Sequence, residues 1–318
     1  MFDIIGDIHG YYHPLLRLLR KLGYQDVNGV YRHPTRTAIF VGDLIDRGPH
    51  QIEVYRLIRK MVEHGSAQVV MGNHELNAVL WTIPHPKYPD KFLRSHNESN
   101  FRQHHAFLKQ VGEHSALHQE IIAWFKTLPL WIETEDFRVI HACWLPEAMA
   151  TLQQDNILDE KARIKDLLAW QNIGTKDSIA YHAVETLLKG IEFDLPQGLS
   201  FIDKEGKKRT QTRVKWWLPE QQKYLSQLAL TGHEFKNLTE DPIIDIPRYA
   251  ACKPVFIGHY WLKHRPEILS SCVACVDYSV AAPTYYAKLV AYRHKGEQTL
   301  SNDHFVWVKA HPDIKHPA

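Results

Sequence analysis

Cysteine and long apolar runs are scarce in this chain of 318 residues. Four cysteines are too few for a disulfide scaffold, and they predict a reducing compartment, the cytoplasm. No apolar run approaches the ~20 residues that a membrane-spanning helix needs, which excludes an integral membrane protein. The N-terminus has an acid, Asp3, where a secretory signal would have a basic region before a long apolar stretch, so we expect no such signal.

Net charge is also small. The 38 Lys and Arg residues against 36 Asp and Glu leave +2, which is too balanced to predict a nucleic-acid or membrane partner from charge. Hydrophobic residues make up 44% and charged residues 23%, as in ordinary globular proteins. The unusual count is histidine, at 21. Because histidine is the commonest metal ligand and acid/base group near neutral pH, the grouping of these residues is informative.

Strand and helix patterns alternate in the first third of the chain. Strands are expected at residues 2–6, 37–41 and 68–71, and helices at 14–22, 51–64 and 74–81. Further on we expect a mostly helical segment over 82–136, helices over 157–170 and 178–190, and a hairpin over 199–217 with its turn near 204–208. Later strands are expected at 137–142, 255–257, 272–276, 287–292 and 305–308. The order predicts an α/β fold with a parallel or mixed sheet covered by helices.

We find no internal repeat, low-complexity segment or linker. The length equals about two domains at ~150 residues each, but one large α/β domain with an insertion fits it equally well. We therefore expect a single domain over residues 1–318, with a helical and hairpin cap inserted at 144–250.

Polar side chains follow five of the predicted strands, and glycines accompany them. In an open α/β sheet, ligands bind in the crevice outside the carboxyl ends of the strands. Carboxylates, an amide and imidazoles together suit Mn²⁺, Fe²⁺ or Zn²⁺. Six ligands exceed the needs of one ion that keeps a place for water, so they predict two ions sharing a carboxylate. The six are Asp7, His9, Asp43, Asn73, His141 and His259.

The motifs Gly-Asp-Ile-His-Gly, Gly-Asp-Leu-Ile-Asp-Arg-Gly and Gly-Asn-His-Glu occur in this order, followed by a histidine after a strand and by Gly-His. This series resembles the phosphoprotein-phosphatase group of the calcineurin-like metallophosphoesterases, of bacterial type. The resemblance implies a mixed-sheet α/β sandwich flanked by helices and a metal-dependent phosphoesterase. It further implies that Asp7, His9 and His259 hold one ion. Asn73, His141 and the neighbourhood of His259 would complete the other.

By the same resemblance Asp43 bridges the two ions, with manganese expected first and iron or zinc as alternatives. A water between two such cations loses a proton near neutral pH and attacks phosphorus in line. His74 follows a ligand directly, so its side chain diverges from the ions, and we interpret it as the acid that protonates the leaving oxygen. Asp46 would orient His74, and Arg47 would hold two phosphate oxygens with its fork. The plainer alternatives are a helix cap for Asp46 and a surface ion pair for Arg47.

A second phosphate clamp is expected at either Arg213 or Arg248. The predicted hairpin has a local charge of +4, which indicates either a solvated face or a lid for an anionic substrate. Trp216 and Trp217 at its end could stack on a nucleobase, although packing in the core is the commoner role. The histidines of the 82–136 segment, His104 among them, are interpreted as surface or core residues.

The sequence departs from the family pattern beside two ligands. Ala142 and Cys143 stand where Gly-Gly is common, and Tyr260 stands where Thr is common. These neighbours shape the substrate groove, so the resemblance indicates the reaction class rather than the substrate. The first hypothesis is hydrolysis of phosphate monoesters, with a phosphoprotein or a nucleotide as the phosphorylated substrate. The alternatives are a dinucleoside polyphosphate, a nucleic-acid end, or a non-catalytic binding scaffold.

Overall fold

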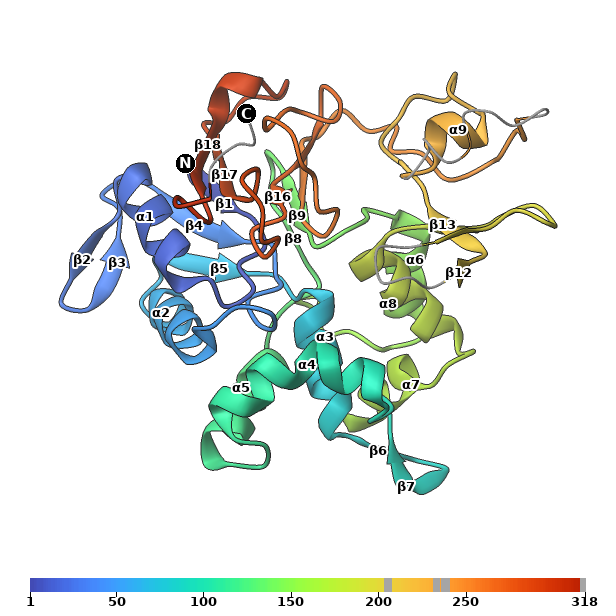
Figure 1. Ribbon diagram of the computed structural model, residues 1–318, viewed down its shortest axis with the longest axis horizontal. Coiled ribbons are helices and arrows are strands. Elements are labelled where there is room, and N and C mark those ends of the chain that lie inside the picture. The colour runs from blue at the N-terminus through green and yellow to red at the C-terminus, as the bar shows by residue number, and fades with distance from the viewer. Residues whose placement is uncertain (203–207, 231–234, 236–240, 315–318) are drawn as a thin grey trace.

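The computed structural model describes residues 1–202, 208–230, 235 and 241–314 (Figure 1). Two β-sheets form its centre. The strands of the first are β1 (Phe2–Ile5), β4 (Thr37–Phe40), β5 (Ala67–Val69), β16 (Asp277–Tyr278), β17 (Lys288–His294) and β18 (Phe305–Lys309). The strands of the second are β8 (Trp131–Glu133), β9 (Arg138–Ile140), β14 (Val255–Ile257) and β15 (Val273–Cys275).

Both sheets contain parallel and antiparallel pairs. The first has the order β16-β17-β1-β4-β5, with β18 also paired to β17. Within it β1 is parallel to β4 and antiparallel to β17. The second has the order β15-β14-β9-β8, in which β14 is parallel to both of its neighbours and β8 is antiparallel to β9. The expected α/β fold with mixed sheets is confirmed.

The central strands β1, β4 and β14 are mostly apolar because both of their faces are buried. Along β1, Ile4 packs between the two sheets together with Phe256 of β14, whereas Ile5 points to the other side, toward the helices. Along β4, Ile39 and Phe40 alternate in the same way. Successive side chains of a strand point to opposite faces, so each central strand serves both layers of the core.

Helices cover the outer sides of the sheets (Figure 1). They are α1 (Tyr12–Leu22), α2 (Gln51–Glu63), α3 (Asn73–Thr82), α4 (Glu98–Val111), α5 (Ala116–Phe125), α6 (Pro146–Gln154), α7 (Leu167–Gly174) and α8 (Ile179–Lys189). Helix α1 buries Leu15, Leu18, Leu19 and Leu22 on one face and ends at Gly23, whose φ of 96° only glycine adopts readily. None of the helices in the described part of the chain is long and apolar enough to cross a membrane.

Two short hairpins extend from this core. They are β2 (Gln25–Val27) with β3 (Val30–Arg32), and β6 (Pro84–His85) with β7 (Tyr88–Phe92).

The expected helix over 157–170 is wrong for its first ten residues. Residues 157–166 form a turn closed by a bridge between Leu158 and Ile164. The Asp159 carboxylate accepts hydrogen bonds from the amides of Lys161 and Arg163, both at 2.9 Å. A carboxylate that binds nearby amides competes with helical hydrogen bonding, so the chain turns instead. The helix α7 begins only after Asp166, which caps it by accepting from the Ala169 amide.

The predicted hairpin over 199–217 differs from the observed pairing. Strand β11 (Phe201–Ile202) pairs with β12 (Lys208–Arg209), but β13 (Gln211–Arg213) pairs with β10 (Glu192–Asp194). The predicted turn falls mostly on residues 203–207, which lie outside the described residues. The hydrophobic pattern locates strands but does not choose their partners, since each strand offers two edges.

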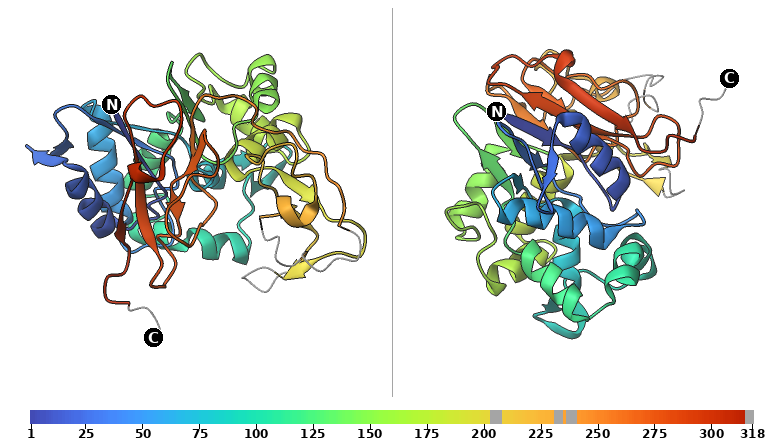
Figure 2. Two further views of the ribbon diagram at one scale, coloured as in Figure 1. Left: turned by 90° about the horizontal axis from the view of Figure 1, so that it is seen from above. Right: turned by 90° about the vertical axis from the view of Figure 1, so that its left-hand side faces the viewer.

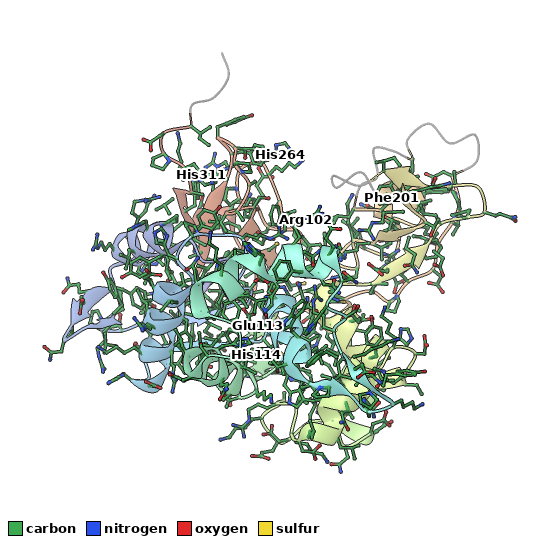
Figure 3. The ribbon with its side chains drawn as sticks, turned by 60° about the horizontal axis from the view of Figure 1, so that its bottom comes forward. Arg102, Glu113, His114, Phe201, His264 and His311 are labelled. Carbon is green, nitrogen blue, oxygen red and sulfur yellow. The ribbon has the colours of Figure 1, made fainter. Side chains whose placement is uncertain are left out.

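Residues 191–246, here called the small unit, have an apolar cluster of their own that includes Val214, Leu225 and Ile244. The unit also contains the short helix α9 (Leu225–Leu228) and lies at one side of the molecule (Figures 1 and 2). Figure 3 shows Phe201 of this unit far from His114 in the α4–α5 region. Helices α6 to α8 instead share the main cluster. We therefore propose that the inserted cap within residues 144–250 has its independent core only in the small unit.

Candidate metal centre

The loops after five strands meet at one end of the two sheets. They follow β1, β4, β5, β9 and β14, and they bring together the side chains that the sequence predicts as ligands. Five of the six are buried, and the sixth, that of His259, is partly buried. They are Asp7, His9, Asp43, Asn73, His141 and His259.

Asp43 occupies the middle of this group. Its Oδ2 lies 3.4 Å from Nε2 of His141, 3.8 Å from Nε2 of His9 and 3.9 Å from Nε2 of His74. Its Oδ1 accepts a hydrogen bond from the His74 amide at 2.9 Å. One carboxylate oxygen thus faces imidazoles that come from three different loops.

Backbone carbonyls orient two of the imidazoles. Nδ1 of His9 donates to the Ile45 carbonyl at 3.0 Å, and Nδ1 of His141 donates to the Val41 carbonyl at 2.7 Å. A carbonyl only accepts, so Nδ1 carries the proton in both rings and Nε2 offers a lone pair to the centre. Burial, followed by the charge of His74, lowers the pKa of His9 to about 3, which keeps this ring neutral at pH 7.

His259 lies with the second group of ligands and not with His9. Its Nδ1 is 2.8 Å from Oδ1 of Asn73, and Nε2 of His141 is 3.1 Å from the same oxygen. Ligand atoms of Asp43, His141 and His259 all lie within 4.8 Å of one another, as do those of His9, Asp43 and His74. The amide of His259 also donates to Oδ2 of Asp7 at 3.1 Å. From the position of the imidazole we propose that His259 belongs with Asn73 and His141, whereas the resemblance places it with Asp7 and His9.

The electrostatics of the centre fit divalent cations. Burial, followed by the negative charges of Asp277 and Asp43, raises the pKa of Asp7 well above its usual range. Burial, with Asp43 adding to it, also raises the pKa of Glu75 to about 7. Nε2 of His9 and Nε2 of His259 are buried and have no hydrogen-bond partner within residues 1–202, 208–230, 235 and 241–314. Crowded carboxylates and unpartnered imidazole nitrogens are what a bound cation would satisfy.

The backbone is strained at this end of the sheets. His9, Asp43, Asp46, Arg47, His259 and Trp261 all have positive φ values, from 48° to 70°. Residues other than glycine rarely adopt this region, and they persist there only when the surrounding structure holds them. Residues with such strained backbone, clustered in three loops around one group of side chains, are typical of functional sites.

Two glycines are required by close approach. A Cβ added at Gly258 would lie 2.1 Å from Oδ1 of Asp7, and one added at Gly72 would lie 2.4 Å from Oδ1 of Asp43. Any larger residue at either position would displace a predicted ligand.

His74 is held by Asp46, as the sequence analysis expects for an acid and its orienting group. Nδ1 of His74 lies 2.5 Å from Oδ2 of Asp46, and both side chains are buried. Burial by itself raises the pKa of Asp46, but the charge of His104 and the hydrogen bonds from His104 and His74 outweigh it and hold that pKa well below its usual range. Asp46 is therefore ionised and accepts from both rings.

Arg47 is exposed beside this pair, and its guanidinium lies 4.5 Å from the ring centre of Trp261. The amide of Trp261 donates to Oδ2 of Asp277 at 2.6 Å, which fixes the loop that holds the indole. A guanidinium stacked on an indole keeps its N–H groups free at the edge for a planar anion.

The two candidates for a second clamp differ in their surroundings. Arg213 lies on β13, and its charge is among the causes, after burial, that lower the pKa of His259. Its Nε, like Nη1 of Arg248, is buried without a hydrogen-bond partner in the part of the chain that the structure describes, and its ion pair with Glu192 spans 3.8 Å. Arg248 donates to the Gln222 carbonyl at 2.9 Å, and the charges that act on it come from Asp245 and Glu220.

Residues 1–217 match the family described as calcineurin-like phosphoesterases. The chain belongs to this family. The family and the class of enzyme that the five motifs predict are thereby confirmed.

Two relatives match only parts of the chain, and a solved structure of low identity spans nearly all of it. Bis(5'-nucleosyl)-tetraphosphatase PrpE [asymmetrical] of Halalkalibacterium halodurans is 55% identical over 74 residues, which are 23% of this chain and 30% of that protein. The protein of the same name in Bacillus subtilis is 31% identical over 175 residues, 54% of this chain and 66% of that protein. A serine/threonine phosphatase structure from Saccharomyces cerevisiae has 15% identity and a TM-score of 0.47, covering 99% of this chain and 81% of that one.

Two buried residues of this calcineurin-like centre have no role in the sequence analysis. Glu75 accepts hydrogen bonds from the amides of Asp43, Leu44 and Gly72, at 2.8 to 3.0 Å, and so ties two of the ligand loops together. The sequence feature that could have revealed this role is an acid three residues after Gly72, the residue that directly precedes α3. The other is His104, whose Nδ1 lies 2.9 Å from Oδ1 of Asp46.

The tryptophan pair is part of the core, which confirms the commoner of its two expected roles and excludes the alternative of a base-stacking surface. Trp216 is 1% exposed and Trp217 6%. Nε1 of Trp216 donates to the hydroxyl of Tyr260 at 3.0 Å, and that residue directly follows His259. The pair thus joins the small unit to the ligand loop.

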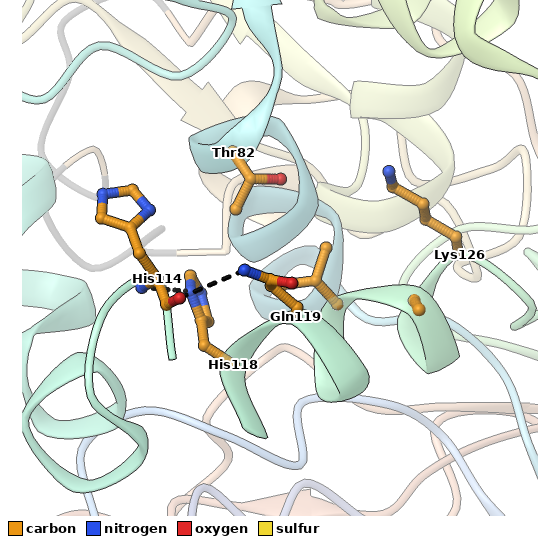
Figure 4. Close-up of a pocket in the computed structure, with 7 residues that line it drawn as sticks. Thr82, His114, His118, Gln119 and Lys126 are labelled. Carbon is orange, nitrogen blue, oxygen red and sulfur yellow. Dashed lines mark hydrogen bonds between the residues drawn. The ribbon is translucent and has the colours of Figure 1, made fainter. Parts of the chain in front are cut away.

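A cavity of about 360 Å³ lies away from the centre, between the end of α3 and α5 (Figure 4). It is lined by Thr82, His114, His118, Gln119, Ile122, Ala123 and Lys126, and none of the predicted site residues contributes to it.

Proposed function

We propose that the chain is a two-metal hydrolase that opens phosphoanhydride bonds of dinucleoside polyphosphates. The observation that supports the reaction is the convergence of three imidazole nitrogens on Oδ2 of Asp43, within 3.9 Å. The substrate class is supported by the names of the curated relatives, which match 23% and 54% of the chain. Manganese is proposed as the metal because the ligands combine carboxylate and amide oxygens with imidazole nitrogens.

A second candidate is hydrolysis of phosphate monoesters such as phosphoserine. It is supported by the buried pair of Asp46 and His74, since an alkoxide leaving group needs a proton more than a phosphate leaving group does. A nucleic-acid end remains a less favoured substrate because the net charge of +2 provides no general attraction. The cytoplasm remains the proposed compartment, supported by four unpaired cysteines.

In the proposed reaction, Asp7, His9 and Asp43 would hold one ion, and Asp43, Asn73, His141 and His259 would hold the other. The ions, when bound, supply an activated water and neutralise charge on the phosphate. Arg47 and Arg213 bind and orient the phosphate oxygens. As the water oxygen bonds to phosphorus, the bond to the leaving oxygen breaks. That oxygen takes the proton from Nε2 of His74, and Asp46 keeps the ring aimed at it.

Diadenosine tetraphosphate and a phosphoserine peptide, tested side by side with the manganese-loaded protein, distinguish the two substrates. We expect a higher kcat/KM for the dinucleotide. Attack at an outer anhydride leaves a nucleoside monophosphate and a triphosphate, whereas attack at the central one leaves two diphosphates, and chromatography separates these outcomes. Unequal products are expected. A preference for the peptide would replace the first candidate with the second, and no turnover of either would contradict the proposed class of substrate.

Arg213 and Arg248 form a matched pair of substitutions. Arg213→Met is expected to lower kcat/KM about 10- to 100-fold, mainly through KM, because a charge-assisted hydrogen bond contributes ~1.5–3 kcal/mol. Arg248→Met should leave kcat/KM near the wild-type value, since its guanidinium binds a carbonyl within the small unit. Steady-state kinetics of both variants check this, and the reverse ranking would assign the clamp to Arg248.

A further inference from the structure

The Asp46 carboxylate is shared by two histidines. Oδ2 lies 2.5 Å from Nδ1 of His74, and Oδ1 lies 2.9 Å from Nδ1 of His104. All three side chains are buried. An ionised carboxylate only accepts hydrogen bonds, so both Nδ1 atoms carry protons, and each oxygen of Asp46 has its own imidazole donor.

His104 comes from outside the motif loops. It lies on α4, 58 residues from Asp46 along the chain. Its ring stacks on Phe107 at 5.0 Å between centroids and lies 5.6 Å from the ring of Trp81. Its Nε2 is buried without a hydrogen-bond partner among the described residues. Within the described residues this buried imidazole makes its hydrogen bond with Asp46, a contact that an apolar residue of similar shape would not provide.

The hydrogen bonds of the Asp46 backbone do not fix the orientation of its carboxylate. Its φ of 69° lies in the left-handed region, and its amide donates to Oε1 of Gln51 at 2.8 Å. Gln51 in turn donates to the Gly48 carbonyl. These bonds hold the backbone of Asp46 but leave its carboxylate free to rotate about χ2, a broad torsion. The bond from His104 removes this freedom.

We propose that His104 is a positioning residue for proton donation, which locks the Asp46 carboxylate and thereby aims Nε2 of His74 at the leaving oxygen. The inference rests on the proposed function, because it gives His104 a role in that reaction. It differs from a purely structural role in one respect: loss of His104 should affect most those substrates whose leaving group depends on the proton.

The variants are His104→Phe, which keeps an aromatic ring beside Phe107 but has no donor, and His104→Asn, whose amide can replace Nδ1. His118→Phe is the matched control. His118, on α5, is also buried and packs against the ring of Phe107. Its Nδ1 accepts from the His114 amide and makes no contact with Asp46 among the described residues. Thermal unfolding monitored by circular dichroism verifies that each variant folds.

With the manganese-loaded protein, His104→Phe is expected to lower kcat for phenyl phosphate, a poor leaving group, by about 10- to 100-fold, the range found when an orienting hydrogen bond is removed. The loss with nitrophenyl phosphate, a good leaving group, should be less than threefold, and KM should stay unchanged for both. His104→Asn should recover most of the loss, and His118→Phe should show none. Equal losses for the two substrates, or a larger effect of His118→Phe, would overturn the proposal.

Two further measurements separate this inference from the proposed function. In a His74→Asn background, adding His104→Phe should cause no further loss of kcat, because His104 acts through His74. By proton NMR of the Mg²⁺-loaded protein, the low-field Nδ1–H resonance that disappears in His74→Asn should shift or broaden in His104→Phe and stay in place in His118→Phe. If the resonance responds but no substrate is turned over, the proposed function fails and the positioning stands. An unchanged resonance overturns the positioning itself.

Discussion

Replacing Asp43 with asparagine is expected to lower kcat/KM for phosphate release by at least about a thousandfold, equal to ~4 kcal/mol of transition-state stabilisation. The reason is its central position: Oδ2 of Asp43 faces the Nε2 atoms of three histidines. Asparagine keeps the size of the side chain and an oxygen for the His74 amide, but it removes the charge that two cations would share. Metal content by mass spectrometry should fall together with activity.

A surface substitution provides the control for this experiment. Asp90 is exposed on β7, outside the centre, and Asp90→Asn should keep wild-type activity and metal content. Circular dichroism should show both variants folded. Turnover in Asp43→Asn within tenfold of wild type would contradict the shared carboxylate, and with it the two-metal mechanism.

Replacing Arg36 with leucine is expected to lower the free energy of unfolding by about 3–5 kcal/mol, because it leaves a buried carboxylate without its main partner. Nε of Arg36 lies 2.9 Å from both oxygens of Asp3, which is fully buried on β1. Arg36 also donates to the carbonyls of Phe2 and His294, and so joins β1 to β17. Urea unfolding of the metal-free protein measures the effect.

The matched control is an ion pair in water. Arg102 pairs with Glu98 on α4, where both side chains are more than three-quarters exposed, at 77% and 86%. Arg102→Leu should change the free energy of unfolding by no more than ~0.5 kcal/mol, since water and salt screen such pairs. Combining Arg36→Leu with Asp3→Asn should recover part of the loss, because the buried charge is then removed. A cost below ~1 kcal/mol for Arg36→Leu would show that Arg293, 3.2 Å from Asp3, suffices as a partner.

The hydrophobic pattern of the sequence predicted the central strands and the helix α2, because these depend on residues close together in the chain. The runs at β1, β4 and β14 are mostly apolar because sheets and helices bury both of their faces, and such runs are visible in sequence. Helix α2 was predicted over 51–64 and extends over Gln51–Glu63. The helix predicted over 157–166 is wrong because the Asp159 carboxylate accepts hydrogen bonds from nearby amides and stabilises a turn there. Hydrophobic periodicity does not reveal such a side-chain contact.

Part of the candidate metal centre could also be predicted from the sequence, and part could not. Its six predicted ligands could be listed from sequence because each follows a strand, and strand ends in such sheets meet at one edge. The grouping of His259 with Asn73 and His141 could not be predicted, since it depends on how β14 is placed beside β9. The burial of Trp216 against Tyr260 likewise depends on where the small unit packs.

By itself, then, the sequence determined the family, the strands and the order in which acids and histidines follow them, because these are properties of neighbouring residues. Only the tertiary structure decided which side chains share an atom: three imidazoles on one oxygen of Asp43, and His104 of α4 on Asp46. The physical reason is that periodicity and turn chemistry act over a few residues. A hydrogen bond between residues 58 positions apart exists only once helices and sheets have packed and excluded water around it.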